Sequence, residues 1–180
     1  YSSGDDENPG VDYKMSNTFI KNIRALDIKS DKPILVHMQS VGGEWSDGMA
    51  IYDAITMCRS HVTIIPYGQA ESMSSIIFQA ADTRLITPHT YFMSHYGSTS
   101  AGGDYLNVQN WVKYEKQICD VMLDIYAQQC CNGKFFIEKY GKGAKTKVKN
   151  YLSTKLKSGD WYITAQEAVH YGFADKVIVS

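Results

Sequence analysis

The fold is decided by residues 62–78, which read VTIIPYGQAESMSSIIF. The β-branched apolar run at the start of this stretch predicts a strand over Val62–Pro66, and the apolar residues at its end predict a helix over Ser72–Ala81. Gly68 has no Cβ and therefore permits a tight turn between the two elements. The stretch predicts a strand, a turn and a helix that begins at Ser72.

Ser72 has two interpretations at this position. Serine is a common N-cap, whose side-chain oxygen accepts a hydrogen bond from a free backbone N–H of the first helical turn. A serine at a helix start can also be a nucleophile, because the free N–H groups and the helix dipole stabilise developing negative charge. Ser74 and Ser75 are weaker candidates, since they lie deeper in the helix. Capping is the commoner role of a lone serine, so the rest of the chain decides between the two.

Strand and helix patterns alternate along the whole chain. Apolar runs indicate strands, and apolar residues at a spacing of three to four indicate helices. This alternation predicts an α/β fold with right-handed crossovers and a largely parallel sheet. The stretch 96–103 is either a loop or an edge strand. Besides the two elements above, we expect strands over 34–38, 84–87, 91–95 and 175–179, and helices over 12–27, 46–58, 106–129 and 164–172.

Length and composition restrict the class of protein. A chain of 180 residues that is 44% apolar suits a single domain over residues 1–180. Eighteen basic residues balance nineteen acidic ones, so charge favours neither nucleic acid nor a membrane as partner. No apolar run has the length of a membrane span, and no signal peptide is visible. The chain begins with Tyr1 rather than Met, which leaves a preceding segment open.

The four cysteines, Cys58, Cys119, Cys130 and Cys131, lack the spacing of a zinc site. Free thiols in a reducing compartment are expected, with a redox role for the adjacent pair as the alternative. A reducing compartment agrees with the cytoplasm, and an organelle or viral origin stays open.

Two polar segments are expected to be mainly exposed to solvent. The acidic, turn-rich residues 1–10 predict a loop. Residues 139–157 contain seven lysines and predict a solvated helical or loop insertion, with a docking patch for an acidic partner as the alternative. Neither Gly133-Lys134-Phe135 nor Gly141-Lys142-Gly143 fits a phosphate-binding loop, since no Ser or Thr follows the Lys. We therefore expect no ATP hydrolysis by this chain itself.

Candidate functional residues follow three of the expected strands. Gly42-Gly43 comes after the strand over 34–38, Ser72 after the next strand, and His95 after the strand over 91–95. The carboxyl ends of parallel strands meet at one edge of a sheet, where α/β proteins place their sites. The sequence therefore predicts a site at this edge.

Four motifs occur in a fixed order along the chain. Ser40-Val41-Gly42-Gly43 is followed by a helix, and residues 68–73 read Gly-Gln-Ala-Glu-Ser-Met. His95 lies seven residues after Pro88, and residues 160–175 contain an aspartate, aromatics and Ala-x-Glu-Ala-x-x-Tyr-Gly-x-x-Asp. In these motifs the chain resembles the proteolytic subunit of the Clp protease, a serine peptidase.

The resemblance implies a ClpP/crotonase-like α/β fold, built as a superhelix of repeated β-β-α and βαβ units with a protruding helical handle. It implies a catalytic triad of Ser72, His95 and Asp160, with the backbone N–H groups of Gly43 and Met73 as the oxyanion hole. Such a site needs no metal or cofactor. The family forms two stacked heptameric rings that enclose the active sites, hydrolyses unfolded polypeptides, and works with an ATP-driven AAA+ unfoldase.

The chain departs from the family pattern at Val41, which replaces a proline, and at Glu71, where a small residue is usual. The segment between the long helix and Asp160 is longer than in the family, and the lysines of 139–157 lie in the excess. We expect no counterpart of the family's N-terminal axial loops. Two alternatives therefore stay open. One is a catalytically weak or inactive ring or scaffold subunit, and the other is a crotonase-type enzyme that acts on coenzyme A thioesters.

Overall fold

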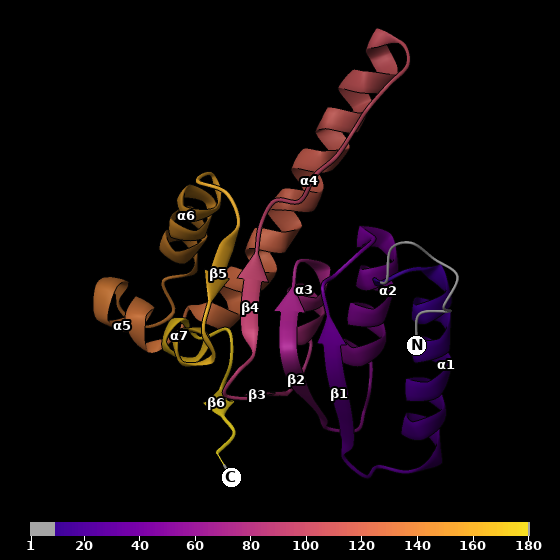
Figure 1. Ribbon diagram of the computed structural model, residues 1–180, viewed down its shortest axis with the longest axis vertical. Helices are drawn as coiled ribbons and strands as arrows, with labels where there is room; N and C mark the ends of the chain where they lie inside the picture. The colour runs from indigo at the N-terminus through magenta and orange to yellow at the C-terminus, as the bar shows by residue number, and fades with distance from the viewer. Residues whose placement is uncertain (1–9, 180) are drawn as a thin grey trace.

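Strand β2 (Val62–Glu71) is the centre of the sheet in the computed structural model, which describes residues 10–179 (Figure 1). Strand β1 (Ile34–Ser40) pairs with β2 in parallel along one edge. Along the other edge β2 pairs first with β3 (Thr83–Ile86) and then with β4 (Tyr91–Ser94), both in parallel. This single long strand thus aligns the carboxyl ends of β1, β2 and β4 at one edge of the sheet.

The remaining two strands extend the sheet at its margins. Strand β6 (Lys176–Val177) pairs in parallel with β3, and β5 (Trp161–Ile163) pairs antiparallel with β4. Because β5 runs in the opposite direction, its start lies beside the end of β4. The sheet is therefore mixed rather than wholly parallel.

Helices surround the sheet on both sides of β2 (Figure 1). Helix α2 packs between α1 and α3, and α4 packs against α3 and α6. The bounds of the helices are α1 (Tyr13–Lys29), α2 (Trp45–Thr56), α3 (Met73–Phe78), α4 (Tyr105–Cys130), α5 (Lys134–Tyr140), α6 (Lys145–Leu156) and α7 (Ala165–Tyr171).

Helix α4 projects well beyond the sheet (Figure 1). Its buried residues all lie between Met122 and Cys130, in the half of the helix that packs on the core. The other half exposes large apolar side chains, among them Leu106 at 66% and Val112 at 61%. This is the protruding handle that the resemblance implies.

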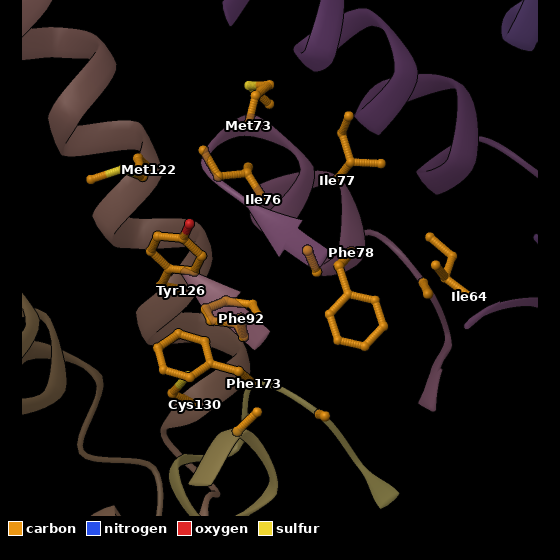
Figure 2. Packing of buried hydrophobic residues seen from close by; sticks show 14 of the residues in the cluster. Ile64, Met73, Ile76, Ile77, Phe78, Phe92, Met122, Tyr126, Cys130 and Phe173 are labelled. Carbon is orange, nitrogen blue, oxygen red and sulfur yellow. The ribbon is translucent and has the colours of Figure 1, made fainter. Parts of the chain in front are cut away.

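Aromatic side chains from distant parts of the chain form the core between α4 and the sheet (Figure 2). The ring of Phe92 in β4 stacks on Phe173 at 4.6 Å between centroids. Tyr126 of α4 meets Phe173 edge to face at 5.4 Å. Burying each such side chain contributes roughly 1.5–3 kcal/mol. The packing anchors one half of α4 next to the helix that follows Ser72.

The predicted turn at Gly68 is wrong. Strand β2 continues through Gly68 to Glu71, and Gly68 has a φ of 67° within the strand. The pairing of β1 with β2 shifts between Met38 and Ser40, so this region of β2 accommodates an irregularity in the ladder. Gly68 provides the backbone conformation for that irregularity, which a residue with a Cβ would resist. The turn occurs instead at Ser72.

The Lys-rich segment is more closely packed than the expected solvated insertion. Helix α6 buries Val148, Leu152 and Leu156, and the ammonium of Lys149 lies 2.7 Å from a carboxylate oxygen of Asp124 on α4. Residues 145–156 are therefore a supporting layer for α4. Helix α5 and strand β5 were not expected from the sequence, and the stretch 96–103 is a loop. The prediction for residues 1–10 lies almost wholly outside the described residues.

The expected ends of the last helix and the expected free thiols are confirmed. Thr164 and Glu167 form the capping box of α7, and Gly172 ends that helix in a left-handed conformation. All four cysteines are free. Between residues 10 and 179, none of the helices is both long and apolar enough to cross a membrane.

Candidate active site

Ser72 occupies a strained turn between β2 and α3. Its φ of 51° makes it the one non-glycine residue with a positive φ among residues 10–179. Its N–H donates to the carbonyl oxygen of Met93 at 2.9 Å. Ser72 is the N-cap residue of α3 by position, but its side chain makes no capping hydrogen bond within the described residues. A conformation of this kind costs on the order of 1–3 kcal/mol and concentrates at functional sites.

The hydroxyl of Ser72 contacts the imidazole of His95. The distance between Oγ and Nε2 is 2.8 Å. The contact follows from the sheet, because Glu71 at the end of β2 pairs with Met93 in β4. Strands β2 and β4 therefore end side by side, and the residues that follow them face one another.

Asp160 completes a chain of three side chains. Its Oδ1 lies 3.1 Å from Nδ1 of His95. Ser94 pairs antiparallel with Trp161, so His95, which follows Ser94, lies beside Asp160, which precedes Trp161. A neutral imidazole that donates from Nδ1 to the carboxylate has a free lone pair on Nε2, which accepts the hydroxyl proton of Ser72. The side chain of His95 is 24% exposed and that of Asp160 is 52% exposed.

The turn after β1 lies directly against Ser72. Gly42 has a φ of 97°, and a Cβ on Gly42 would lie 2.8 Å from the backbone nitrogen of Met73. The turn is tied down by Val11, whose N–H donates to the carbonyl of Gly42 at 2.7 Å. Among residues 10–179, neither the N–H of Gly43 nor that of Met73 donates to a protein acceptor. Gly43, Ser72 and Met73 line the same cleft.

A cleft of about 430 Å³ opens beside these groups. Among residues 10–179, its wall contains the carboxylates of Glu44 and Glu115 and no lysine or arginine. Cys119 also lines it, and burial is the main cause that raises the pKa of this thiol. The other lining residues are Gly43, Trp45, Ser46, Ser72, Met73, Ile76, His95, Tyr96, Gly97, Ser98, Thr99, Trp111, Tyr114, Ile118 and Met122.

Glu71 brings a carboxylate close to the site. Partial burial raises the pKa of Glu71, while a hydrogen bond with Gln69 and the charge of His95 act in the opposite direction. The carboxylate is therefore poorly solvated for a group at the end of a strand. It adds negative charge near the imidazole.

The two other serines of α3 and three other histidines lie elsewhere or are inaccessible. Ser74 and Ser75 are fully buried. His37 contacts the hydroxyl of Tyr67, and His61 contacts that of Thr83. His170 packs on an aromatic ring at 5.7 Å between centroids. Within the described residues, the side-chain contacts of these groups do not involve the hydroxyl of Ser72.

The structure adds contacts around the site that the sequence analysis missed. Tyr126 approaches the turn of Ser72 from α4, and Ser40 accepts hydrogen bonds from both the N–H of Gly42 and the hydroxyl of Ser74. Tyr126 is 51 residues away from its partner Ser75 in sequence, so no local pattern relates them. Only the packing of α4 on α3 reveals the contact.

Comparison with known proteins identifies the family. A family model for the Clp protease matches residues 8–180, and together with the mixed sheet it confirms the expected ClpP/crotonase-like α/β fold. The ATP-dependent Clp protease proteolytic subunit 2 of Pseudomonas aeruginosa is 29% identical over 173 residues, which cover 95% of this chain and 78% of that relative.

Two further relatives extend this finding. Proteolytic subunit 1 of Protochlamydia amoebophila is 31% identical over 175 residues, covering 94% of this chain and 77% of the relative. The proteolytic subunit of Deinococcus radiodurans is 26% identical over 171 residues, covering 93% and 76%. The chain therefore belongs to the Clp protease family.

Proposed function

We propose that this protein is a serine-type endopeptidase subunit, of the ATP-dependent Clp protease proteolytic type, that hydrolyses peptide bonds of unfolded polypeptides. The observation that carries the proposal is the continuous contact from the hydroxyl of Ser72 through His95 to Asp160, at 2.8 and 3.1 Å. Such a chain of nucleophile, base and orienting carboxylate is recognised by its geometry. The cleft beside it provides room for a peptide segment.

In the proposed mechanism Ser72 attacks the scissile carbonyl carbon while His95 takes the hydroxyl proton at Nε2. Asp160 accepts a hydrogen bond from Nδ1 and stabilises the imidazolium. The C–N bond then breaks as His95 gives its proton to the leaving amine, and the acyl group stays on Ser72. Water, deprotonated by His95, releases the acid and restores the free hydroxyl.

The tetrahedral intermediates of this reaction carry a negatively charged oxygen. We assign its stabilisation to the N–H groups of Gly43 and Met73, because neither has a protein acceptor among residues 10–179. Losing one such donor lowers turnover by about 10²–10³-fold in a serine peptidase. Both donors lie on turns that are fixed by backbone contacts.

The proposal extends to an assembled particle. The exposed apolar residues on the outer half of α4 support a homo-oligomer, since a monomer gains nothing from exposing them. We propose stacked heptameric rings that enclose the sites, with an AAA+ unfoldase as partner for folded substrates. Four free cysteines support a reducing compartment such as the cytoplasm. The single peptidase domain over residues 1–180 is part of the same proposal.

A serine-reactive fluorophosphonate probe tests the reaction. We expect the assembled protein to be labelled once per chain, with labelling and peptide cleavage both lost in Ser72→Ala. Native mass measurement of both proteins establishes that they assemble equally. An assembled wild-type particle without labelling or cleavage would disprove the peptidase proposal.

One alternative retains structural support. A weak or inactive scaffold subunit is favoured by the partly buried carboxylate of Glu71 near the nucleophile and by the exposed Val41 at the turn before Gly42. It predicts an assembled particle that the probe does not label. A coenzyme A thioester enzyme also predicts no labelling, and acyl-thioester turnover would distinguish it from a scaffold.

A further inference from the structure

The hydroxyl of Ser75 makes two short contacts that the proposed mechanism does not use. Its Oγ lies 2.6 Å from the carbonyl oxygen of Ser72 and 2.6 Å from the phenol oxygen of Tyr126. Ser75 and Tyr126 are 0% and 1% exposed. Figure 2 shows the phenol oxygen of Tyr126 at the end of the ring that is turned toward α3. These three groups form a buried chain that ends at the backbone of the candidate nucleophile.

The directions of the hydrogen bonds follow from the chemistry of the groups. A carbonyl oxygen only accepts, so Ser75 donates its hydroxyl proton to the carbonyl of Ser72. The oxygen of Ser75 then accepts the proton of Tyr126. Burial raises the pKa of Tyr126 well above its ordinary value, which keeps the phenol protonated and able to donate. Every hydroxyl in the chain is satisfied.

The hydrogen bonds of Ser75 and Tyr126 act on the backbone of Ser72. The carbonyl of Ser72 accepts a second hydrogen bond from the N–H of Ser75 at 3.0 Å. On the other side of the residue, the N–H of Ser72 is bound to the carbonyl of Met93. The strained φ of 51° at Ser72 therefore persists between two fixed peptide groups. Relaxation of this residue would turn its side chain away from His95.

We propose that Ser75 and Tyr126 are positioning residues that keep the hydroxyl of Ser72 in reach of His95. Neither touches the substrate or the reacting atoms, and they act through the carbonyl of Ser72. The inference rests on the proposed peptidase function and goes beyond it, because it assigns a role to a side chain of α4 and to the third residue after the nucleophile.

The expected effects follow from this role. Ser75→Ala removes the hydroxyl bond to the carbonyl of Ser72, and a small displacement of a reacting atom is costly in rate. We expect kcat to fall about tenfold with KM unchanged, which corresponds to the loss of one buried hydrogen bond. Tyr126→Phe leaves that bond in place but removes its support, and we expect a smaller fall, about threefold.

The double variant Ser75→Ala/Tyr126→Phe separates positioning from stability. Ser75→Ala alone leaves the buried phenol without a partner and lowers the melting temperature, whereas removing both partners restores much of it. If the chain positions Ser72, kcat stays low in the double variant although the melting temperature recovers. The rate of fluorophosphonate labelling should fall in parallel with kcat.

Matched controls lie away from the site. Ser60→Ala removes a buried hydroxyl just before β2, at the end of the strand opposite to Ser72, where it donates to Ser30 at 3.2 Å. Tyr151→Phe makes the same change as Tyr126→Phe in the partly buried part of α6. Both controls should keep the wild-type kcat.

The outcomes are distinct. Wild-type kcat in Ser75→Ala, or recovery of kcat together with the melting temperature in the double variant, would overturn the positioning role alone. A wild-type particle that neither cleaves nor labels would overturn the proposed function and this inference with it. Low kcat in a thermally recovered double variant supports both.

Discussion

The backbone of Gly42 lies against the turn of Ser72 so closely that a Cβ built on Gly42 would stand 2.6 Å from the Cβ of Ser72. Gly42→Ala must therefore displace one of the two turns, and its φ of 97° adds backbone strain. The Cβ added at Gly42 would also lie 2.8 Å from the backbone nitrogen of Met73, a proposed oxyanion donor. We therefore expect kcat/KM for a peptide to fall about 100-fold or more. Steady-state cleavage measures this.

Gly102→Ala is the matched control for this change. Gly102 has no positive φ, and a Cβ at that position would meet nothing within 4 Å. It should cleave at the wild-type rate. Full activity in Gly42→Ala would show that the turn tolerates displacement and would remove Gly43 from the proposed oxyanion hole.

Glu71 is expected to lower stability at neutral pH. Partial burial is the main cause that raises the pKa of Glu71 above its ordinary 4.5, so the folded protein disfavours the ionised form. The free energy of unfolding therefore decreases as pH rises from the ordinary pKa of the unfolded chain through the raised pKa of the folded protein. We expect Glu71→Gln to melt at a higher temperature than the wild type at pH 7, with the difference vanishing in acid.

Thermal unfolding, monitored by circular dichroism across this pH range, measures the difference in melting temperature. Glu138→Gln on the exposed surface of α5 is the control and should show no such dependence. A lower melting temperature for Glu71→Gln at pH 7 would mean that the carboxylate has a stabilising partner in the assembled protein.

Asp27, unlike Glu71, is expected to stabilise the fold at neutral pH. The backbone N–H of Ser60 is the main cause that lowers the pKa of Asp27, and the N–H of Arg59 also donates to the same carboxylate oxygen. This contribution is present above the ordinary value of 3.8 and is lost as pH falls through the lower folded value. Asp27→Ala leaves two N–H donors unpaired, and we expect its melting temperature at pH 7 to fall by roughly several degrees.

Asp31→Ala is the control for that change, because the side chain of Asp31 is 87% exposed and lies 3.9 Å from the guanidinium of Arg59. Its melting temperature should match the wild type within about one degree. Equal melting of Asp27→Ala and the wild type at pH 7 would contradict the prediction.

The outer half of α4 should carry the contacts between subunits. Val112→Asp places a charge on an exposed apolar surface, and we expect the native particle to dissociate into smaller species, as measured by light scattering after gel filtration. Gln117→Asp adds the same charge about 140° around the helix and should leave the particle intact. Dissociation of both variants, or of neither, would argue against a contact centred on Val112.

Much of the fold could be predicted because hydrophobic periodicity is a local signal. The helices expected over 12–27, 46–58 and 106–129 are α1, α2 and α4, each with small shifts at its ends. The helix after Ser72 is shorter than expected, since it ends at Phe78. Strand β5 has three residues and is defined by its pairing with β4, so no pattern in the sequence marks it.

The candidate site was predictable only in part. The carboxyl ends of parallel strands explain why Ser72 and His95 lie at one edge, which the order of elements predicts. The position of Asp160 depends on the register of β5, and before the structure it rested on the family resemblance alone. The contact between Ser75 and Tyr126 depends on how α4 packs, and the sequence contains no signal for it.

Cys119 lines the cleft beside Ser72, so a thiol-directed inhibitor would mislead a test of the proposed peptidase. A maleimide attached to its sulfur would fill space that a peptide needs, and turnover would cease although the proposed mechanism uses no thiol. Inactivation by such a reagent would therefore resemble that of a papain-like hydrolase. Cys119→Ser should make the protein resistant to maleimide while it remains sensitive to fluorophosphonate.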